Sequence, residues 1–298
     1  MHPSIMPCPL PSGDLLFGGT SLSSLQELAT RSDAEIDVAL GAALISKDAY
    51  PSLDVSALLA ELDQMAAPLF HLGLEEQSAD KQSKVLADHV YGALGFRGNE
   101  TDYYDPKNSL LSDVMARRLG IPITLAIIYC EIARRVGVPA RGVGFPGHFL
   151  VRIESSGGSR GSALTVDPFF GGRVLEEESI VRLLRRALGP EETLRPSEHL
   201  SPATPKAILI RLLTNLKAIH MTRGEHARAH LALDRILLFT PNAPAILRER
   251  GLLAARLGAL ESARVDLTRA IELDPDAADE WSLRARLDEL EGKHRVLN

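Results

Sequence analysis

The chain has 298 residues, of which 45% are apolar and only 5% aromatic, and its formal net charge is −6 at pH 7. This length allows one large domain or two ordinary ones, and a core made mostly of Leu, Ile, Val and Ala suits packed helices. No apolar run is long enough to span a bilayer, and the first residues lack the basic and apolar segments of a signal peptide. We therefore expect a cytoplasmic protein with no membrane or nucleic-acid partner, since its basic residues do not form a continuous run.

The two cysteines, Cys8 and Cys130, are too isolated in the sequence for a disulfide framework. Cys8 falls in a predicted tail, whereas Cys130 falls in an apolar helical segment. No group of Cys and His residues has the spacing of a structural zinc site. We expect neither a metal nor a cofactor, and a reducing compartment fits this cysteine usage.

Charge is distributed unevenly along the chain. Residues 1–100 carry 5 Lys and Arg against 14 Asp and Glu, whereas residues 206–256 carry 9 against 3. One interpretation is that two solvated surfaces attract each other across a domain contact. The other is a basic face for an acidic partner. The first is favoured because the basic residues alternate with predicted core positions.

The first hundred residues are predicted to be a tail followed by helices. Residues 1–33 are expected to form an N-terminal tail. Apolar residues then recur with a helical period in three segments, 34–46, 53–70 and 80–94. Asp54 is a plausible cap for the second segment. The loop that follows, "GFRGNETDYYDPKN", is rich in Gly, Asn, Asp and aromatic residues.

One helix in the middle of the chain is predicted to be buried. Ser109 can cap a short helix that runs to about Leu119. Pro122 then stands where a helix tolerates proline, in its first turn. The run Ile123–Val136 is nearly all apolar, which is typical of a helix that is covered on most of its faces.

A small sheet is predicted after this helix. Three β-rich segments occur at 141–145, 148–154 and 163–169, and residues 176–187 return to a helical pattern. Helices followed by a small antiparallel sheet predict an α+β domain over residues 34–195.

The C-terminal part, residues 205–292, repeats with a period of 34 residues after a linker near 195–205. Four pairs share this spacing: Gly224 and Gly258, Ala229 and Ala263, Leu233 and Leu267, and Pro241 and Pro275. This period, with small residues at helix crossings and a closing proline, indicates tetratricopeptide repeats. Because stable arrays usually need three repeats, we expect these to pack on the N-terminal domain or on a cap helix that contains Trp281. Repeats of this kind offer a concave surface for a partner protein or peptide.

Two residues of the predicted sheet have the types needed for nucleophilic catalysis. His148 lies in "PGHFLVRI" and Asp167 in "TVDPFF", on adjacent predicted strands. Neighbouring antiparallel strands can hold such side chains within hydrogen-bond distance. In that chemistry the imidazole activates a nucleophile at a helix N-terminus, and the carboxylate orients the imidazole.

The central segment resembles the transglutaminase-like superfamily, through "GVPARGV", His148 and "VDPF" with Asp167. More specifically, "GFRGN", "YYDPKNSLL", "RRLGIPIT", "GVGFPGHFLVR" and "DPFFGG", in this order, are similar to the bacterial SirB family. The resemblance covers about residues 35–290. It implies a papain-like domain of helices and a small antiparallel sheet, followed by an all-α segment of tetratricopeptide repeats. It supplies no reaction and no named partner.

The chain departs from the superfamily pattern at the nucleophile. Counting back from "GVPARGV" places Pro122 where the catalytic cysteine would stand. Cys130 lies eight residues further on, about 12 Å along a helix and about 80° around its axis. It is therefore predicted to be a small buried apolar residue. Thr124 and Ser109 lie nearer, but each would need a base in contact with its hydroxyl.

Two interpretations of His148 and Asp167 remain open. They form either a structural hydrogen bond between two strands or the centre of a retained ligand cleft. The residues predicted to line that cleft are Tyr103, Tyr104, Asn108, Thr124, Phe145, His148 and Asp167. The favoured hypothesis is a non-catalytic adaptor that binds a peptide or partner protein. The alternative is an active hydrolase or acyltransferase with an unusual nucleophile or an activated water. The sequence indicates no oligomeric state.

Overall fold

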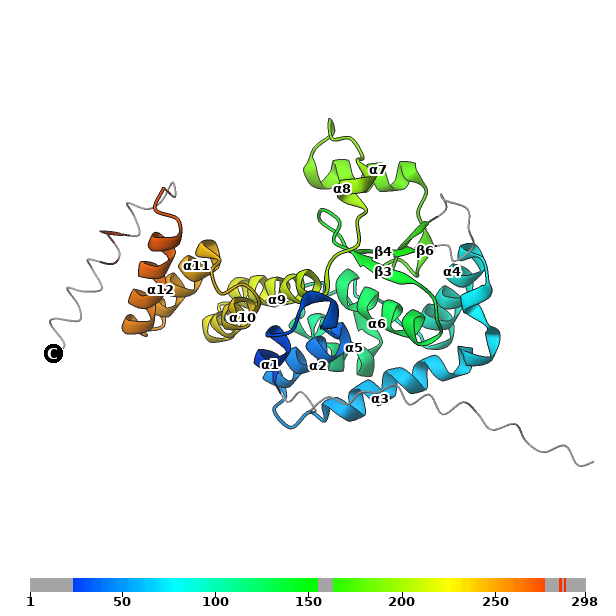
Figure 1. The fold of residues 1–298 in the computed structure, drawn as a ribbon, viewed down its shortest axis with the longest axis horizontal. Helices are drawn as coiled ribbons and strands as arrows, with labels where there is room; N and C mark the ends of the chain where they lie inside the picture. The colour runs from blue at the N-terminus through cyan, green and yellow to red at the C-terminus, as the bar shows by residue number, and fades with distance from the viewer. Residues whose placement is uncertain (1–23, 155–162, 277–283, 286, 288–298) are drawn as a thin grey trace, which may run out of the picture.

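A computed structural model describes residues 24–154, 163–276, 284–285 and 287. In these ranges an N-terminal α+β domain is followed by repeat helices that extend from one side of it (Figure 1). The α-helices of the first domain are α1 Leu25–Ala29, α2 Val38–Ala49, α3 Val55–Ala66, α4 Ala79–Ala87, α5 Leu111–Arg117, α6 Pro122–Arg135, α7 Glu177–Leu188 and α8 Pro196–His199. Short 3-10 helices are η1 Asp33–Glu35, η2 Ala67–Leu72, η3 Leu74–Glu76 and η5 Pro106–Ser109, and a π-helix, η4 Asp88–Ala93, continues α4.

The end of the predicted tail is ordered. Ser24 and Glu27 form a reciprocal capping box that starts α1, and Leu25 and Leu28 are buried. Helix α1 also packs against the repeat helix α10 (His226–Phe239). Helix α1 has only five residues, and its two buried leucines are too few to form a recognisable helical pattern in the sequence. This explains why the segment was predicted to belong to the tail. Residues 1–23 lie outside the described residues.

Side-chain caps decide where several helices begin. Asp37 and Asp54 each accept a hydrogen bond from the backbone N–H three residues later, at 2.9 and 3.0 Å. The helix predicted over 34–46 therefore begins at Val38. Ser109 does not cap α5 as predicted. Leu110 holds the cap position, and the Ser109 hydroxyl is buried with no hydrogen-bond partner in the described structure.

Helix α6 lies at the centre of the first domain, and 11 of its 14 residues are buried. One antiparallel sheet with strand order β3-β4-β5-β6 packs on it. Its strands are β3 Ala140–Val143, β4 Leu150–Ile153, β5 Leu164–Asp167 and β6 Arg173–Val174, and a separate parallel pair joins β1 Arg97–Gly98 to β2 Leu119–Gly120.

The two faces of the sheet belong to different apolar clusters. Val151, Ile153 and Val166 join the main core with α6, whereas Leu150 joins a smaller cluster with Ile180 of α7. Figure 1 shows α6 below the sheet and α7 above it. The period of two in a strand places alternate side chains on opposite faces, so one strand serves both clusters.

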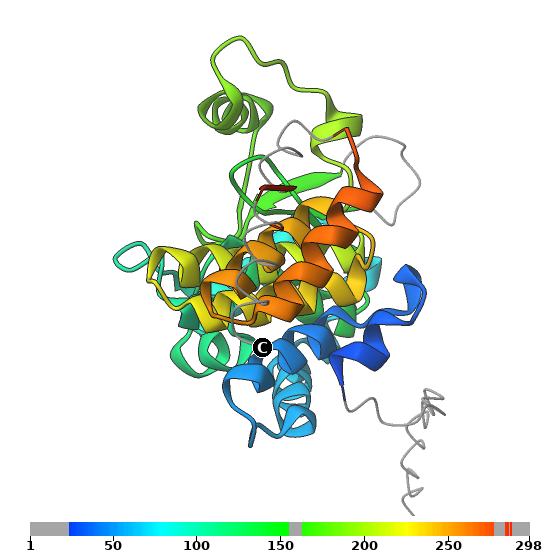
Figure 2. The same cartoon turned by 90° about the vertical axis from the view of Figure 1, so that its left-hand side faces the viewer.

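The repeat helices are α9 Pro205–Thr222, α10 His226–Phe239, α11 Pro244–Arg256 and α12 Leu260–Leu273. The first pair shares the main core of the N-terminal domain, to which α9 contributes Leu209, Leu212 and Leu213. Helices α2 and α9 approach so closely that a Cβ on Gly41 would lie 2.4 Å from Leu209 Cδ1. Figure 2 shows the repeat helices stacked in front of this domain. The repeats were expected to pack on the N-terminal domain, and α9 and α10 do so. Trp281, which was expected in a cap helix, lies outside the described residues.

The predicted linker near 195–205 is built into the fold. It contains α8, and the Ala203 N–H donates to the Gly142 carbonyl of β3 at 2.8 Å. The charge asymmetry of the sequence appears as a cross-domain ion pair, in which Arg235 binds Asp48 with two 2.8 Å contacts. Within the described part of the chain, no helix combines the length and the apolar character that a membrane crossing requires.

Candidate functional site

His148 and Asp167 are in contact. His148 Nε2 lies 3.0 Å from Asp167 Oδ1. Asp167 is fully buried at the end of β5, and the His148 side chain is 12% exposed. An Nε2–H that donates to the carboxylate leaves the Nδ1 lone pair free to act as a base. This orientation of the imidazole fits both interpretations, a catalytic triad and a structural hydrogen bond between two strands.

Tight turns place both side chains. The carboxylate Oδ1 of Asp167 also accepts from the backbone N–H groups of Phe169 and Phe170, at 3.0 and 3.4 Å, which folds the loop after β5. The turn before His148 needs Gly147, whose φ is +65° and whose Cβ position would lie 3.2 Å from Ala187 Cβ of α7. These turns bring the imidazole to the surface beside α7 while its partner stays buried.

An open cavity of about 560 Å³ lies in front of His148, and we call it the cleft. The residues that line it are Tyr103, Tyr104, Pro122, Pro146, Gly147, His148, Phe169, Phe170, Leu183, Arg186 and Ala187. It thus brings together His148, Tyr103, Tyr104 and Pro122, four of the residues singled out in the sequence. No Cys, Ser or Thr occurs among these described lining residues.

Pro122 is the first residue of α6, and its ring lines the cleft. Thr124 lies in the same first turn of the helix and is fully buried. The Thr124 hydroxyl accepts from the Ile121 N–H at 3.1 Å and lies 2.8 Å from the Asn108 carbonyl, to which it donates. Thr124 therefore closes the start of the helix and does not face the cleft as predicted.

Asn108 and Phe145 also differ from the prediction. Asn108 is fully buried, and its amide nitrogen donates to the Asp102 and Tyr103 carbonyls at 2.7 and 3.2 Å. It shapes the loop that carries Tyr103 without lining the cleft. Phe145 is fully buried in the cluster beneath α7, next to Leu150. The sequence alone does not distinguish a phenylalanine in the core from one that lines the cleft, because only tertiary packing decides between the two.

Cys130 lies on a different cavity, of about 730 Å³, which we call the Cys130 cavity. Its lining includes Ala126 and Ile127 of α6, Arg141 of β3 and Phe149, but not His148. Burial raises the pKa of the Cys130 thiol well above its usual value, and the neighbouring Glu131 carboxylate adds to the shift. The thiol is thus neutral at physiological pH and separated from the imidazole, as the helical offset from Pro122 predicts.

Three large side chains line the cleft that the sequence did not predict there, Phe169, Phe170 and Arg186. Phe169 stands edge-on to both His148 and Tyr103, with centroids 6.4 and 5.9 Å apart. Phe170 carries the guanidinium of Arg173 over its ring at 4.9 Å. Arg186 of α7 reaches the cleft and has no ion-pair partner among the described residues. The loop "DPFFGG" could have signalled the two phenylalanines, but no sequence pattern marks Arg186.

The phenols are the only hydroxyl groups among the described residues that line the cleft. Burial raises the pKa of the Tyr103 hydroxyl, and the adjacent Tyr104 adds to this effect. A phenol with a raised pKa is a poor nucleophile at neutral pH. Across the described ranges, no group of three His, Cys, Asp or Glu side chains is arranged to hold a metal ion.

Comparisons with known proteins agree with this architecture. A model of the transglutaminase-like superfamily matches residues 56–214, and a tetratricopeptide repeat model matches residues 216–288. A UPF0162 protein of Xylella fastidiosa (strain 9a5c) is 40% identical over 266 residues, which cover 88% of this chain and 93% of that protein. These matches confirm the predicted fold class and the predicted order of its two parts.

More distant relatives match over most of their length. UPF0162 protein PA3419 of Pseudomonas aeruginosa is 30% identical over 246 residues, 83% of this chain and 88% of that protein. Protein SirB1 of Salmonella typhimurium (strain LT2) is 29% identical over 221 residues, 74% of this chain and 80% of that protein. This match confirms the predicted resemblance to SirB proteins. No solved structure matches the chain.

Proposed function

The chain belongs to the transglutaminase-like superfamily, and from that premise we propose that it is a non-catalytic member that binds a peptide in its cleft and a partner protein on its repeats. The observation that supports this proposal is the composition of the cleft. Pro122 stands at the start of α6 beside a His148–Asp167 couple, and no thiol or aliphatic hydroxyl lines the same cavity among the described residues. An activated imidazole without a nucleophile can bind but cannot form an acyl intermediate.

The cleft has the chemistry of a peptide site. Tyr103, Tyr104, Phe169 and Phe170 supply aromatic surface, of which Tyr104 is 69% and Phe170 43% exposed. In the tautomer whose Nε2–H donates to Asp167, His148 Nδ1 supplies a hydrogen-bond acceptor beside this aromatic surface. Exposed aromatic rings beside a few polar groups are typical of recognition sites.

The repeats offer a second surface. Leu252, Leu257 and Val265 of the second repeat are 43%, 45% and 52% exposed. The helices that carry them are held together by Arg250, which binds Asp266 at 2.6 and 2.7 Å and Asp234 at 2.8 Å. A rigid helical array with exposed apolar side chains suits contact with a partner protein.

Covalent probes test the absence of catalysis. We expect iodoacetamide and a fluorophosphonate to give no labelling of the full chain that depends on His148. Stoichiometric labelling of any cleft residue that disappears in His148→Ala would overturn the proposal. Hydrolysis of an ester or amide library by the wild type, but not by His148→Ala, would point instead to a water activated by the imidazole.

Peptide binding is tested by selecting phage-displayed random peptides on the full chain. We expect selected peptides to bind about 10-fold more weakly to Tyr104→Ala, because one well-placed aromatic contact contributes about 1.4 kcal/mol. Phe70→Ala is the matched control, since Phe70 is a similarly exposed aromatic (58%) that does not line the cleft. Peptides that bind both variants as they bind the wild type would exclude the cleft as their site.

A further inference from the structure

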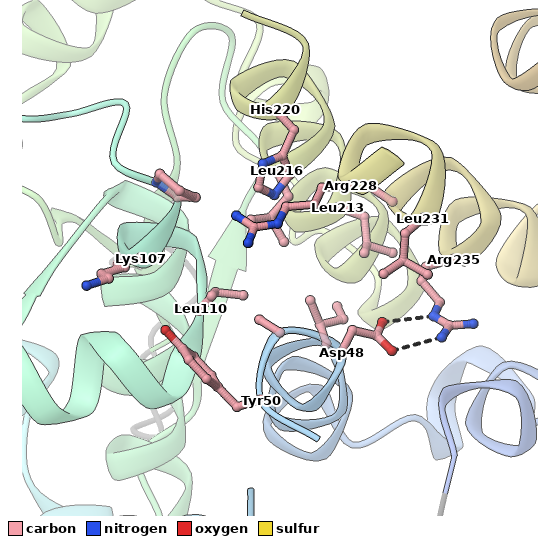
Figure 3. A pocket seen from close by; sticks show the side chains of 14 residues that line it. Asp48, Tyr50, Lys107, Leu110, Leu213, Leu216, His220, Arg228, Leu231 and Arg235 are labelled. Carbon is pink, nitrogen blue, oxygen red and sulfur yellow. Dashed lines mark hydrogen bonds and ion pairs between the residues drawn. The ribbon is translucent and has the colours of Figure 1, made fainter. Parts of the chain in front are cut away.

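A third cavity lies between the two parts of the chain. It has a volume of about 380 Å³, and we call it the interdomain cavity (Figure 3). The N-terminal domain contributes α2, η5 and Leu110 to its walls, and the repeats contribute α9 and α10. Cavities of this size at domain contacts are common sites for small molecules.

The walls of the interdomain cavity are mainly apolar. The apolar residues that line it are Ile45, Ala49, Tyr50, Pro106, Leu110, Leu213, Leu216, Leu231 and Ala232. Figure 3 shows Leu110 and Tyr50 on one side, facing Leu213 and Leu231 on the other. An occupant therefore needs an apolar body that touches both parts of the chain.

The charged residues of this cavity carry an excess of positive charge. Its described lining contains Lys107, Arg228 and Arg235 but only one carboxylate, Asp48. Asp48 already accepts hydrogen bonds from Nε and Nη2 of Arg235, both at 2.8 Å. Lys107 has no ion-pair partner in the described structure, and in Figure 3 it points away from the cavity. The cation of the lining that is left to meet a ligand is therefore Arg228, whose side chain is 68% exposed.

Arg228 is the cation best placed to meet a ligand. Figure 3 shows its guanidinium extending from α10 toward η5, across the cavity. Its one described partner is Glu225 at 3.2 Å, and Glu225 is shared with Arg223 at 3.3 Å and His220 at 2.7 Å. One carboxylate thus serves two guanidinium groups and an imidazole. Burial lowers the pKa of His220, so this imidazole adds little charge at neutral pH.

We propose that the interdomain cavity binds a small amphipathic monoanion, with its acidic head on Arg228 and its apolar body between Leu110 and Leu213. Arginine binds a carboxylate or sulfonate through paired N–H groups, and the leucine walls favour an aliphatic or aromatic body. This proposal is independent of whether the cleft is catalytic. It assigns a ligand class to a cavity that lies at the contact between the two parts of the chain.

One loop connects the interdomain cavity to the cleft. Tyr103 and Tyr104 line the cleft, while Pro106 and Lys107, a few residues later, line the interdomain cavity. Asn108 holds the two halves of this loop together through its bonds to the Asp102 and Tyr103 carbonyls. A ligand against Pro106 therefore restrains the loop that carries the cleft tyrosines.

The experiment titrates the full chain with decanoate by calorimetry, below the concentration at which decanoate forms micelles. We expect one saturable site, and binding of decanol, which lacks the anionic head, at least about 10-fold weaker. Arg228→Gln should weaken decanoate binding by about 10-fold as well. Arg256→Gln, which removes the same charge from α11 away from the cavity, is the matched control and should bind as the wild type does.

A filling substitution and hydrogen exchange locate the site independently. Ala232→Phe places a ring in the cavity and should abolish decanoate binding, with the melting temperature checking the fold. Decanoate should also slow amide exchange in residues 99–110 of the wild type. Absence of a saturable site, equal affinity for decanol, or unchanged binding by Arg228→Gln would each overturn the proposal.

Discussion

Helix α6 borders both the cleft and the Cys130 cavity, but each cavity contains only some of the side chains that a thiol hydrolase needs. The cleft contains an acid–base couple, His148 and Asp167, and no thiol among its described lining residues. The Cys130 cavity contains a thiol, and His148 is not among its lining residues. Catalysis by a thiol requires the sulfur and the imidazole to be in contact. The presence of all three residue types in the chain is therefore no indication of activity.

The same contrast extends to the electrostatics of the two positions. A thiol at Pro122 would stand at the N-terminus of α6, where the helix dipole and an imidazolium favour the thiolate. Cys130 is a turn from the other end of this helix, beside Glu131, and burial raises the pKa of its thiol. One helix is thus expected to activate a thiol at its start, whereas the surroundings of Cys130 raise the pKa of the thiol there.

The largest expected effect comes from moving the thiol from one cavity to the other. In a Cys8→Ser background, Pro122→Cys should be alkylated by iodoacetamide at pH 6–8 at least about 100-fold faster than Cys130, because a thiol beside a helix N-terminus and a histidine has a lowered pKa. A lowered pKa keeps the thiolate populated at pH 6, whereas the raised pKa of Cys130 keeps that thiol protonated even at pH 8. Mass spectrometry of the labelled peptide identifies the site.

The control for this prediction is a cysteine in the same cleft but away from the start of α6. Ala187→Cys lines the cleft on α7 and should react at the rate of an ordinary exposed thiol. Adding His148→Ala to Pro122→Cys should remove most of the acceleration. If Pro122→Cys reacts no faster than Ala187→Cys, the cleft does not have the geometry of a thiol hydrolase.

The next largest effect concerns the buried side of the couple. Asp167→Ala should lower the free energy of unfolding by about 3 kcal/mol, because it leaves the Phe169 and Phe170 N–H groups without their acceptor. Chemical denaturation monitored by circular dichroism measures the change. A loss below about 1 kcal/mol would show that water replaces the carboxylate without difficulty.

The exposed side of the couple should matter less to stability. His148→Ala should cost about 1 kcal/mol, because Asp167 Oδ1 keeps its two backbone hydrogen bonds. The same denaturation experiment tests it. An effect as large as that of Asp167→Ala would favour the purely structural interpretation of the couple, in which the imidazole serves only to join two strands.

The smallest effect is expected in the Cys130 cavity. Cys130→Ala should change the free energy of unfolding by about 0.5–1 kcal/mol, because the side chain is small and already borders open space. Cys130→Ser, of nearly the same volume, serves as the matched variant. A loss above about 2 kcal/mol for Cys130→Ala would indicate that the sulfur packs much more tightly than the cavity suggests.

Much of the fold could be predicted from the sequence because the signals are local. The 34-residue period, the proline at the start of α6 and the apolar run that follows each depend on neighbouring residues along one helix. The α+β domain, its order before the repeats and the family resemblance were confirmed for this reason. The offset between Pro122 and Cys130 was also predictable, since both lie on one regular helix with fixed rise and rotation.

What the sequence could not determine depends on how elements pack together. The choice between Phe145 in the core and Phe169 in the cleft follows from how α7 and the β5 loop cover the sheet. The docking of α9 into the main core rests on Gly41, whose missing side chain lets two helices approach. The interdomain cavity arises from the same contact.

The sequence by itself therefore indicated most of the helices, the strands and the repeats, and it predicts that a proline stands at the nucleophile position. Only the tertiary structure decided which side chains share a cavity. The physical reason is that helical and strand periodicity orient a side chain relative to its own element, whereas a cavity is enclosed by elements that are distant in the chain and positioned by close packing.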